Sequence, residues 1–250
     1  MHSMKLDPAT QGTALCSIAG LQKMTLLDYP GKVACTVFLQ GCNLRCSFCH
    51  NAQLIDGSGA LALTQEELLA FLQKRVGLLE GVCITGGEPT LQPALPELLR
   101  DIKKLGYAVK LDTNGMQPSV LKALVSEGLV DYVAMDIKNS PEKYAQTAGL
   151  PDIALSKIEE SMVFLLEGPV DYEFRTTLVH PLHTKEDLLA IGRWLSRLSE
   201  NKSKKYFLQP FVDRDTVIFS GLSAPEDTLL QQFKEILAPF VHNIKIRGQE

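Results

Sequence analysis

Short apolar runs alternate with amphipathic stretches along most of this 250-residue chain. The runs are rich in β-branched and aromatic side chains and have few polar interruptions. Near-continuous runs of this kind predict parallel strands that are buried on both faces. The predicted strands cover residues 33–39, 82–85, 108–112, 132–137, 172–179 and 206–211.

The stretches between these strands carry helix signals. Thr64 with Glu67, and Thr184 with Asp187, have the spacing of a capping box, in which two side chains satisfy free N–H groups at a helix start. Ser223 and Glu226 predict a third start of the same kind. Further helices are expected over residues 95–105 and 119–127 and, in two pieces, over 140–166, with a last short strand over 243–247.

Six strand–helix units in succession predict an α/β fold with a parallel sheet and right-handed crossovers. Eight units would close a full barrel, so six predict an open, partial (β/α)6 barrel. We expect one domain, with an N-terminal extension or hairpin over residues 1–31, the partial barrel over 32–240 and a C-terminal strand and tail over 241–250. The functional residues should follow the C-terminal ends of the strands.

The composition restricts the setting in which the protein works. Hydrophobic residues make up 45% and charged residues 22%, as in a globular protein with a sizeable core. A net charge of −4 gives no reason to expect nucleic acid or an anionic membrane as a partner. No apolar run reaches the length of about 18 residues that a membrane span needs. Residues 1–12 are polar and lack the core of a signal peptide, so we expect a cytoplasmic protein.

Three of the six cysteines lie within eight residues, directly after the first predicted strand. Cys42, Cys46 and Cys49 have a spacing that favours a metal centre over a disulfide scaffold. Closely spaced thiolates bind zinc or iron–sulfur clusters. Three thiolates would leave one iron of a four-iron cluster open to an outside ligand. The alternative is structural zinc, with His50 or a distant cysteine as the fourth ligand.

The remaining cysteines do not share this spacing. We expect Cys16, Cys35 and Cys83 to be buried as small hydrophobic side chains. Trp194 continues the apolar stripe of its predicted helix, so we expect it in the core as well.

A glycine-rich turn follows the second predicted strand. Gly86 and Gly87 would let the backbone approach a ligand closely, and Glu88 with nearby carbonyl groups would suit an ammonium group. The alternative is an ordinary turn between a strand and a helix.

Charged residues interrupt the apolar strands. Asp112 and Asp136 lie on neighbouring predicted strands, and a buried carboxylate is costly unless a cation pairs with it. Lys138, a metal ion or the charged groups of a ligand would supply that charge. Arg175, inside the fifth predicted strand, needs a carboxylate in turn, either Asp136 or one on a ligand. The alternative is a purely structural set of ion pairs.

The cysteine motif resembles that of the radical S-adenosylmethionine superfamily. The longer string TVFLQGCNLRCSFCHN, residues 36–51, is similar to the activating enzymes of glycyl-radical proteins. The string LDYPGK, residues 27–32, resembles the branch that activates anaerobic ribonucleoside-triphosphate reductase. The resemblance extends from about residue 20 to the sixth predicted strand.

This resemblance implies a [4Fe-4S] cluster on Cys42, Cys46 and Cys49, with S-adenosylmethionine as the second cofactor. In such enzymes the glycine–glutamate loop contacts the methionine amino group, and the aromatic residue between the last two cysteines lies near the adenine. The implied residues for binding S-adenosylmethionine are Phe48, Gly86, Gly87, Glu88, Asp112, Asp136, Lys138 and Arg175. Asp112, Thr113 and Asp136 are implied as ligands of a monovalent cation beside the cofactor carboxylate.

The same resemblance implies the reaction. After an electron arrives from flavodoxin or ferredoxin, S-adenosylmethionine is cleaved to methionine and a 5′-deoxyadenosyl radical, which removes a hydrogen atom from a glycine of a partner enzyme. We expect that partner to be anaerobic ribonucleoside-triphosphate reductase. The alternatives are another glycyl-radical enzyme of the pyruvate formate-lyase type, radical chemistry on a small molecule, simple electron transfer and a zinc-stabilised protein without catalysis. The sequence assigns no catalytic residue beyond the cofactor site.

Overall fold

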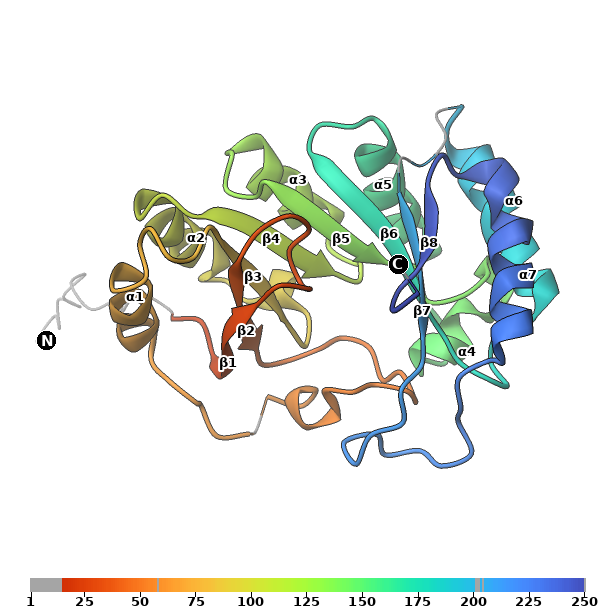
Figure 1. Ribbon diagram of the computed structural model, residues 1–250, viewed down its shortest axis with the longest axis horizontal. Coiled ribbons are helices and arrows are strands. Elements are labelled where there is room, and N and C mark those ends of the chain that lie inside the picture. Colours follow the sequence, from red (N-terminus) through yellow and green to blue (C-terminus); the bar gives the residue numbers. More distant parts are fainter. Residues whose placement is uncertain (1–14, 58, 201–202, 204, 250) are drawn as a thin grey trace, which may run out of the picture.

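In the computed structural model, eight strands form one sheet in chain order (Figure 1). The structure describes residues 15–57, 59–200, 203 and 205–249. The first pair of strands is antiparallel, and every later pair is parallel. The strands are β1 (Ile18–Thr25), β2 (Ala34–Leu39), β3 (Gly81–Gly86), β4 (Ala108–Thr113), β5 (Tyr132–Asp136), β6 (Asp171–Leu178), β7 (Tyr206–Pro210) and β8 (Ile244–Ile246). Within the described residues β1 and β8 do not pair, so the sheet is an open, partial barrel, as the alternation predicts.

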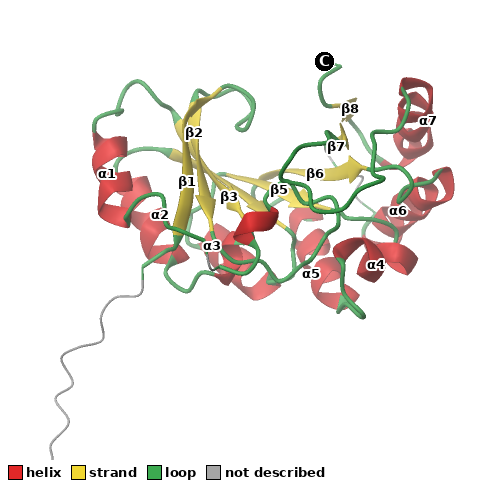
Figure 2. Cartoon of the chain, turned by 90° about the horizontal axis from the view of Figure 1, so that it is seen from below, coloured by secondary structure: helices red, strands yellow, loops and turns green. Residues whose placement is uncertain are grey.

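The α-helices cover the outer face of this sheet, whereas the turn between β1 and β2 and the C-terminal end of the chain lie on the inner side (Figure 2). This is the layer order that right-handed strand–helix–strand units produce. Among the described residues no helix has the length and apolar character that crossing a bilayer requires. The helices are α1 (Gln65–Gln73), α2 (Leu95–Lys104), α3 (Pro118–Ser126), α4 (Tyr144–Ala148), α5 (Leu155–Leu166), α6 (Lys185–Leu198) and α7 (Asp227–Leu237).

Two of the three predicted helix starts are confirmed. Thr64 and Thr184 each form a complete capping box, the former with Glu67 and the latter with Asp187. The third prediction is wrong. Helix α7 begins at Asp227 without a side-chain cap, because the backbone of Ser223 is already paired with His180, through N–H to O distances of 2.8 and 3.1 Å.

The core lies between the sheet and the helices and contains the side chains that the sequence places there. Cys16, Cys35 and Cys83 are buried as free thiols. Trp194 is also buried, and its indole N–H donates a 2.7 Å hydrogen bond to Glu159. These predictions are therefore confirmed.

The connection from β1 to β2 closes the base of the barrel. Tyr29, in the middle of the LDYPGK string, is 3% exposed and contacts Tyr132 with ring centres 6.0 Å apart. A β-carbon at Gly81 would lie only 2.8 Å from the Tyr29 ring. Because Gly81 and Tyr132 begin their strands, Tyr29 lies at the end of the barrel opposite the cysteine loop.

Candidate functional site

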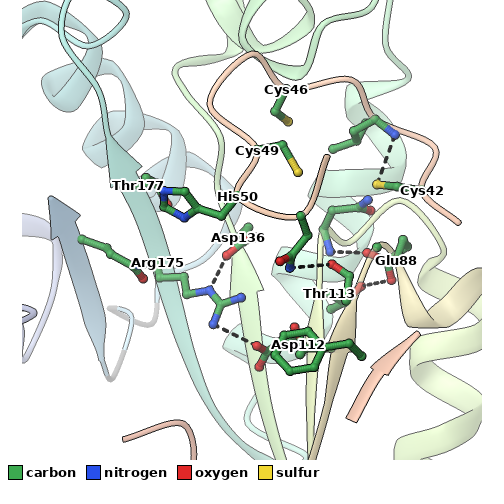
Figure 3. Close-up of a pocket in the computed structure, with 18 of the residues that line it drawn as sticks. Cys42, Cys46, Cys49, His50, Glu88, Asp112, Thr113, Asp136, Arg175 and Thr177 are labelled. Atoms are coloured by element: carbon green, nitrogen blue, oxygen red, sulfur yellow. Dashed lines mark hydrogen bonds and ion pairs between the residues drawn. The ribbon is translucent and has the colours of Figure 1, made fainter. Parts of the chain in front are cut away.

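The cysteine loop, residues 40–51, leaves the C-terminal end of β2 and is fixed by backbone hydrogen bonds from several directions. The Cys42 amide donates to the carbonyl of Ile55 (3.0 Å), and the Arg45 amide donates to the carbonyl of Ala148 (2.8 Å). Within the loop, the Cys49 amide donates to the carbonyl of Cys46 (3.1 Å). Figure 3 shows the sulfur atoms of the three loop cysteines around one shared space above the barrel.

The donor set fits a cluster better than a single zinc ion. Zinc needs four donors within about 2.0–2.3 Å of one point, and among the described residues no three candidate donor side chains are grouped to hold one metal ion. His50 is directed elsewhere, with Nε2 2.6 Å from the carbonyl oxygen of Val212 and its ring stacked on Phe211. Three separate thiols match three corners of a four-iron cluster.

Burial disfavours ionisation of two of the three loop cysteines. It raises the pKa of Cys46 to about 11 and also raises the pKa of Cys42. The thiolates therefore require a positive charge such as that of iron. Cys42 and Cys46 therefore suit the role of metal ligands better than that of ionised nucleophiles at neutral pH.

Gly86 and Gly87 are needed by the packing of the chain on itself. A β-carbon at Gly86, whose φ is +119°, would lie 2.3 Å from backbone atoms of Leu39, and one at Gly87 would lie 2.1 Å from the carbonyl oxygen of Gly41. The side-chain amide of Asn51 donates to the Gly86 carbonyl oxygen (3.2 Å). The end of β3 and the cysteine loop are thus held in backbone contact, which adds a second reason for these glycines beside the predicted approach of a ligand.

Glu88 connects the ends of β3 and β4. Its buried carboxylate accepts hydrogen bonds from the backbone and hydroxyl of Thr90, from the Thr113 hydroxyl (2.8 Å) and from the Asn114 amide (2.7 Å). Burial raises the pKa of Glu88, and these four donors oppose the rise. Contact between this carboxylate and the cofactor amino group stays a prediction. Within the protein, the hydrogen bonds of Glu88 hold the loop after β3 against the loop after β4.

Asn114 is a junction that the sequence analysis did not single out. Besides its backbone bond to Glu88, its side-chain amide donates to Asn43 in the cysteine loop (2.8 Å), and its side-chain oxygen accepts from the Met116 amide (3.0 Å). In the sequence, Asn43 lies within the cysteine motif and Asn114 follows a predicted strand. Neither local pattern indicates that the two side chains form a hydrogen bond.

A chain of ion pairs crosses the mouth of the barrel (Figure 3). Arg175 contacts both Asp136 and Asp112, the latter with 3.2 Å between Nη1 and Oδ2. Lys138 lies 2.7 Å from the second oxygen of Asp136, and Lys110 pairs with the second oxygen of Asp112. The sequence analysis did not predict Lys110 as a member of this group. Like Arg175, it is a charged residue inside an apolar strand, and the same reasoning would have identified it.

These groups are charged, and their charges do not cancel. Burial alone would raise the pKa of both carboxyl groups, but Arg175 and the adjacent lysine outweigh it and hold the pKa of Asp112 and of Asp136 below the usual range. Within this set of five side chains, two anions face three cations, and each aspartate contacts two of the cations. The pairing leaves neither aspartate free for an additional monovalent cation, and Lys138 and Arg175 suit the carboxylate of an amino-acid ligand.

The site also has an apolar part. Phe48 is buried and packs with Val179 and Phe211, and the lining of the cavity includes the polar side chains of Thr177 and Gln209. All twelve predicted site residues line one cavity of about 450 Å³ together with these side chains. The cavity therefore joins a three-thiol loop, a positively charged region and a surface that would suit an aromatic base.

An open parallel barrel with a three-cysteine loop after its first parallel strand defines a class of enzymes that hold an iron–sulfur cluster at the barrel mouth. The profile of the Radical SAM superfamily matches residues 36–195. The chain belongs to the radical S-adenosylmethionine superfamily. Membership implies a [4Fe-4S] cluster and S-adenosylmethionine, and the thiols and charges of the cavity fit both.

Two curated relatives show different degrees of coverage. The putative glycyl-radical enzyme activating enzyme MJ1227 of Methanocaldococcus jannaschii is 30% identical over 236 residues, which cover 92% of this chain and 95% of the relative. The pyruvate formate-lyase-activating enzyme of Clostridium pasteurianum is 36% identical over 127 residues, and the chain spans about half of its length, 52%.

Solved structures share the fold. SuiB of Streptococcus suis, bound to S-adenosylmethionine, gives a TM-score of 0.64 at 15% identity over 84% of this chain and 48% of SuiB. A domain of a pyruvate-formate lyase-activating enzyme from Bacteroides vulgatus gives a TM-score of 0.55 at 20% identity over 67% of this chain and 99% of that domain. Together they support the partial barrel of the superfamily.

Proposed function

We propose that this protein is an activating enzyme that cleaves S-adenosylmethionine reductively and installs a glycyl radical on a partner enzyme. The observation that carries the proposal is the match over nearly the whole length of both chains to a putative glycyl-radical enzyme activating enzyme, at 30% identity. The three-thiol loop and the charged cavity support the same chemistry. For the partner we propose anaerobic ribonucleoside-triphosphate reductase, on the similarity of residues 27–32 and 36–51 to that branch.

The residues of the cavity divide the work of holding the reactants. When bound, the cluster would pass an electron received from flavodoxin or ferredoxin to S-adenosylmethionine, and the cofactor would release methionine and supply the 5′-deoxyadenosyl group that takes a hydrogen atom from glycine. Cys42, Cys46 and Cys49 would hold three irons of the cluster. Lys138 and Arg175 line the cavity with the surplus positive charge and would orient the cofactor carboxylate. Phe48 would pack against the adenine and keep water from that side.

The loops at the ends of β2, β3 and β4 fix the relative positions of the residues that would hold the two cofactors. Hydrogen bonds from Asn51 to Gly86, and from Asn114 to Asn43, fix the cysteine loop against the ends of β3 and β4. The distance between the cluster ligands and the amino-acid end of the cavity is thereby set before any ligand binds. Such pre-organisation lowers the entropic cost of bringing two reactants together.

The test uses anaerobically reconstituted protein, with reduced flavodoxin or ferredoxin as the electron donor. S-adenosylmethionine is added alone, with anaerobic ribonucleoside-triphosphate reductase or with pyruvate formate-lyase, and 5′-deoxyadenosine is quantified beside the electron paramagnetic resonance spectrum. We expect a glycyl doublet on the reductase, and no doublet when its radical-site glycine is replaced by alanine. A doublet on pyruvate formate-lyase and none on the reductase would show that the partner is a glycyl-radical enzyme of the pyruvate formate-lyase type. Cleavage of S-adenosylmethionine with no radical on either protein would favour a small-molecule substrate.

A further inference from the structure

The barrel interior contains a buried lysine, Lys110, that is not among the described residues lining the cofactor cavity. Lys110 is 1% exposed, and its ammonium group pairs with Oδ1 of Asp112 on the same strand. Lys138 and Arg175 reach the cavity surface, whereas Lys110 is absent from the described lining. Its charge is therefore a fixed part of the barrel interior, one layer below the site.

Each aspartate in the group of ion pairs around Lys110 contacts two cations. Asp112 is shared between Lys110 and Arg175, and Asp136 between Arg175 and Lys138. Glu173, one layer deeper on β6, is paired with Arg247 at 2.9 Å and adds no net charge. A further cation beside Asp112 would meet like charges in a buried setting, where repulsion is poorly screened.

The third implied cation ligand is also engaged. The Thr113 hydroxyl donates to Glu88 (2.8 Å) and accepts from the Gly115 amide (3.1 Å). These two contacts engage the hydroxyl within the loop. The carboxylates of Asp112 and Asp136 and the hydroxyl of Thr113 are thus all engaged by groups of the chain itself.

We propose that Lys110 supplies, from inside the barrel, the positive charge that the family resemblance assigns to a monovalent cation, so that this enzyme binds its cofactor without one. Lys110 acts through Asp112 and is a positioning residue. It pairs with Oδ1 of that carboxylate and leaves Oδ2 for Arg175, while Arg175 and Lys138 line the cavity and would face the cofactor carboxylate. This inference concerns the cofactor site of the superfamily and holds whichever partner the enzyme activates.

The wild-type chain provides the first test. Its apoprotein is unfolded by heat in sodium, potassium and tetramethylammonium chloride at one ionic strength, because a cation that binds the folded state raises the unfolding midpoint. After cluster reconstitution, the dissociation constant for S-adenosylmethionine is measured in the same salts. We expect equal midpoints, and dissociation constants that agree within about twofold. A clearly higher unfolding midpoint or a clearly lower dissociation constant in sodium or potassium would overturn the proposal.

Variants separate the charge of Lys110 from its hydrogen bond. Lys110→Met removes both, and Lys110→Gln retains an N–H donor without the charge. We expect both variants to bind S-adenosylmethionine about tenfold more weakly in tetramethylammonium chloride, and to recover in sodium or potassium because a small cation can then enter beside Asp112. Lys104→Met removes the same charge from an exposed position and should show no cation dependence.

The outcomes are distinct. A Lys110→Gln variant that behaves like the wild type in every salt would reduce Lys110 to a structural hydrogen bond and overturn the proposal. If Lys110→Met fails to fold, the wild-type salt series and Lys110→Gln still decide it. Absence of S-adenosylmethionine binding by the wild type in all salts would contradict the proposed function, while the unfolding midpoints of the apoprotein would continue to test Lys110.

Discussion

The side-chain amide of Asn114 donates a 2.8 Å hydrogen bond to the side-chain oxygen of Asn43, and this bond joins the end of β4 to the segment between Cys42 and Cys46. Asn114 is buried; its backbone N–H donates to Glu88, and its side-chain oxygen accepts from the Met116 amide. One residue thus connects the cysteine loop, the glycine–glutamate loop and the end of β4. The position of the first two cluster ligands relative to the glycine–glutamate loop depends on it.

Replacing Asn43 should separate the hydrogen bond from simple packing. Asn43→Asp keeps an acceptor for the Asn114 amide, whereas Asn43→Leu leaves that donor unsatisfied at a cost of about 1–3 kcal/mol. We expect Asn43→Leu to lower both the unfolding midpoint and the iron content after reconstitution, and Asn43→Asp to retain both. The double variant Asn43→Asp, Asn114→Asp places two carboxylates opposite each other and should be worse than the sum of the single changes. Additive effects would show that the pair is not coupled.

Gly87 should tolerate no side chain, for a reason that is purely steric. Its β-carbon would lie 2.1 Å from the Gly41 carbonyl oxygen, and backbone cannot yield as a flexible side chain would. We expect Gly87→Ala to displace the cysteine loop, with a loss of several kcal/mol in the free energy of unfolding and a loss of cluster binding. The measurements are chemical denaturation of the apoprotein and iron analysis.

Gly106→Ala is the matched control for this steric effect. Gly106 has a φ of +89°, and no atom of the described residues lies within 4 Å of the β-carbon position. Only the cost of a left-handed backbone applies, on the order of 1 kcal/mol. Equal losses in the two variants would contradict the close approach of β3 to the cysteine loop.

Much of the fold follows from sequence periodicity, because buried parallel strands and amphipathic helices each have a local signature. All six predicted strands are found, and the capping boxes at Thr64 and Thr184 are formed. The failure at Ser223 is instructive, since its spacing to Glu226 is the same. A long-range backbone pairing with His180 competes for this segment, and no local pattern reports such a contact.

The site was predictable to the extent that its residues have unusual chemistry for their surroundings. Thiols in one loop and charges in apolar strands are visible in one dimension. The partners of those charges are not, because pairing depends on which strands lie side by side and in which register. Lys110 had the same signal as Arg175, but its role became visible only once Asp112, its partner on β4, was found to be shared with Arg175 on β6. Likewise, the role of Tyr29 at the base of the barrel required the path of the β1–β2 connection.

Asp136 should make the folded protein sensitive to acid. Its pKa is held below the usual range in the folded state because Arg175 and Lys138 outweigh the effect of burial. The unfolded state therefore binds more protons in mild acid, and the stability that this group contributes is present at neutral pH. That stability is lost as the pH falls below about 4, the ordinary pKa of aspartate, toward the depressed folded value. The measurement is the unfolding free energy of the apoprotein between neutral and acidic pH.

Asp136→Asn provides the comparison for this pH dependence. Asparagine cannot ionise, so the variant should be less stable at neutral pH, where Arg175 and Lys138 lose a partner, and its stability should fall less steeply in acid. Parallel curves for the two proteins would show that Asp136 does not titrate with a depressed pKa.

Cys46→Ala should abolish the chemistry while leaving the fold in place. Cys46 lies in a loop whose backbone is held by Ala148, Ile55 and other groups that the substitution does not touch. We expect the variant to keep the unfolding midpoint of the apoprotein, to retain little iron after reconstitution and to form no 5′-deoxyadenosine, because two thiolates do not hold a four-iron cluster as three do. Cys16→Ala, at a buried cysteine outside the loop, should retain iron and turnover. If Cys46→Ala turned over as fast as the wild type, the cluster would not be required, and the assignment of radical chemistry to this protein would be wrong.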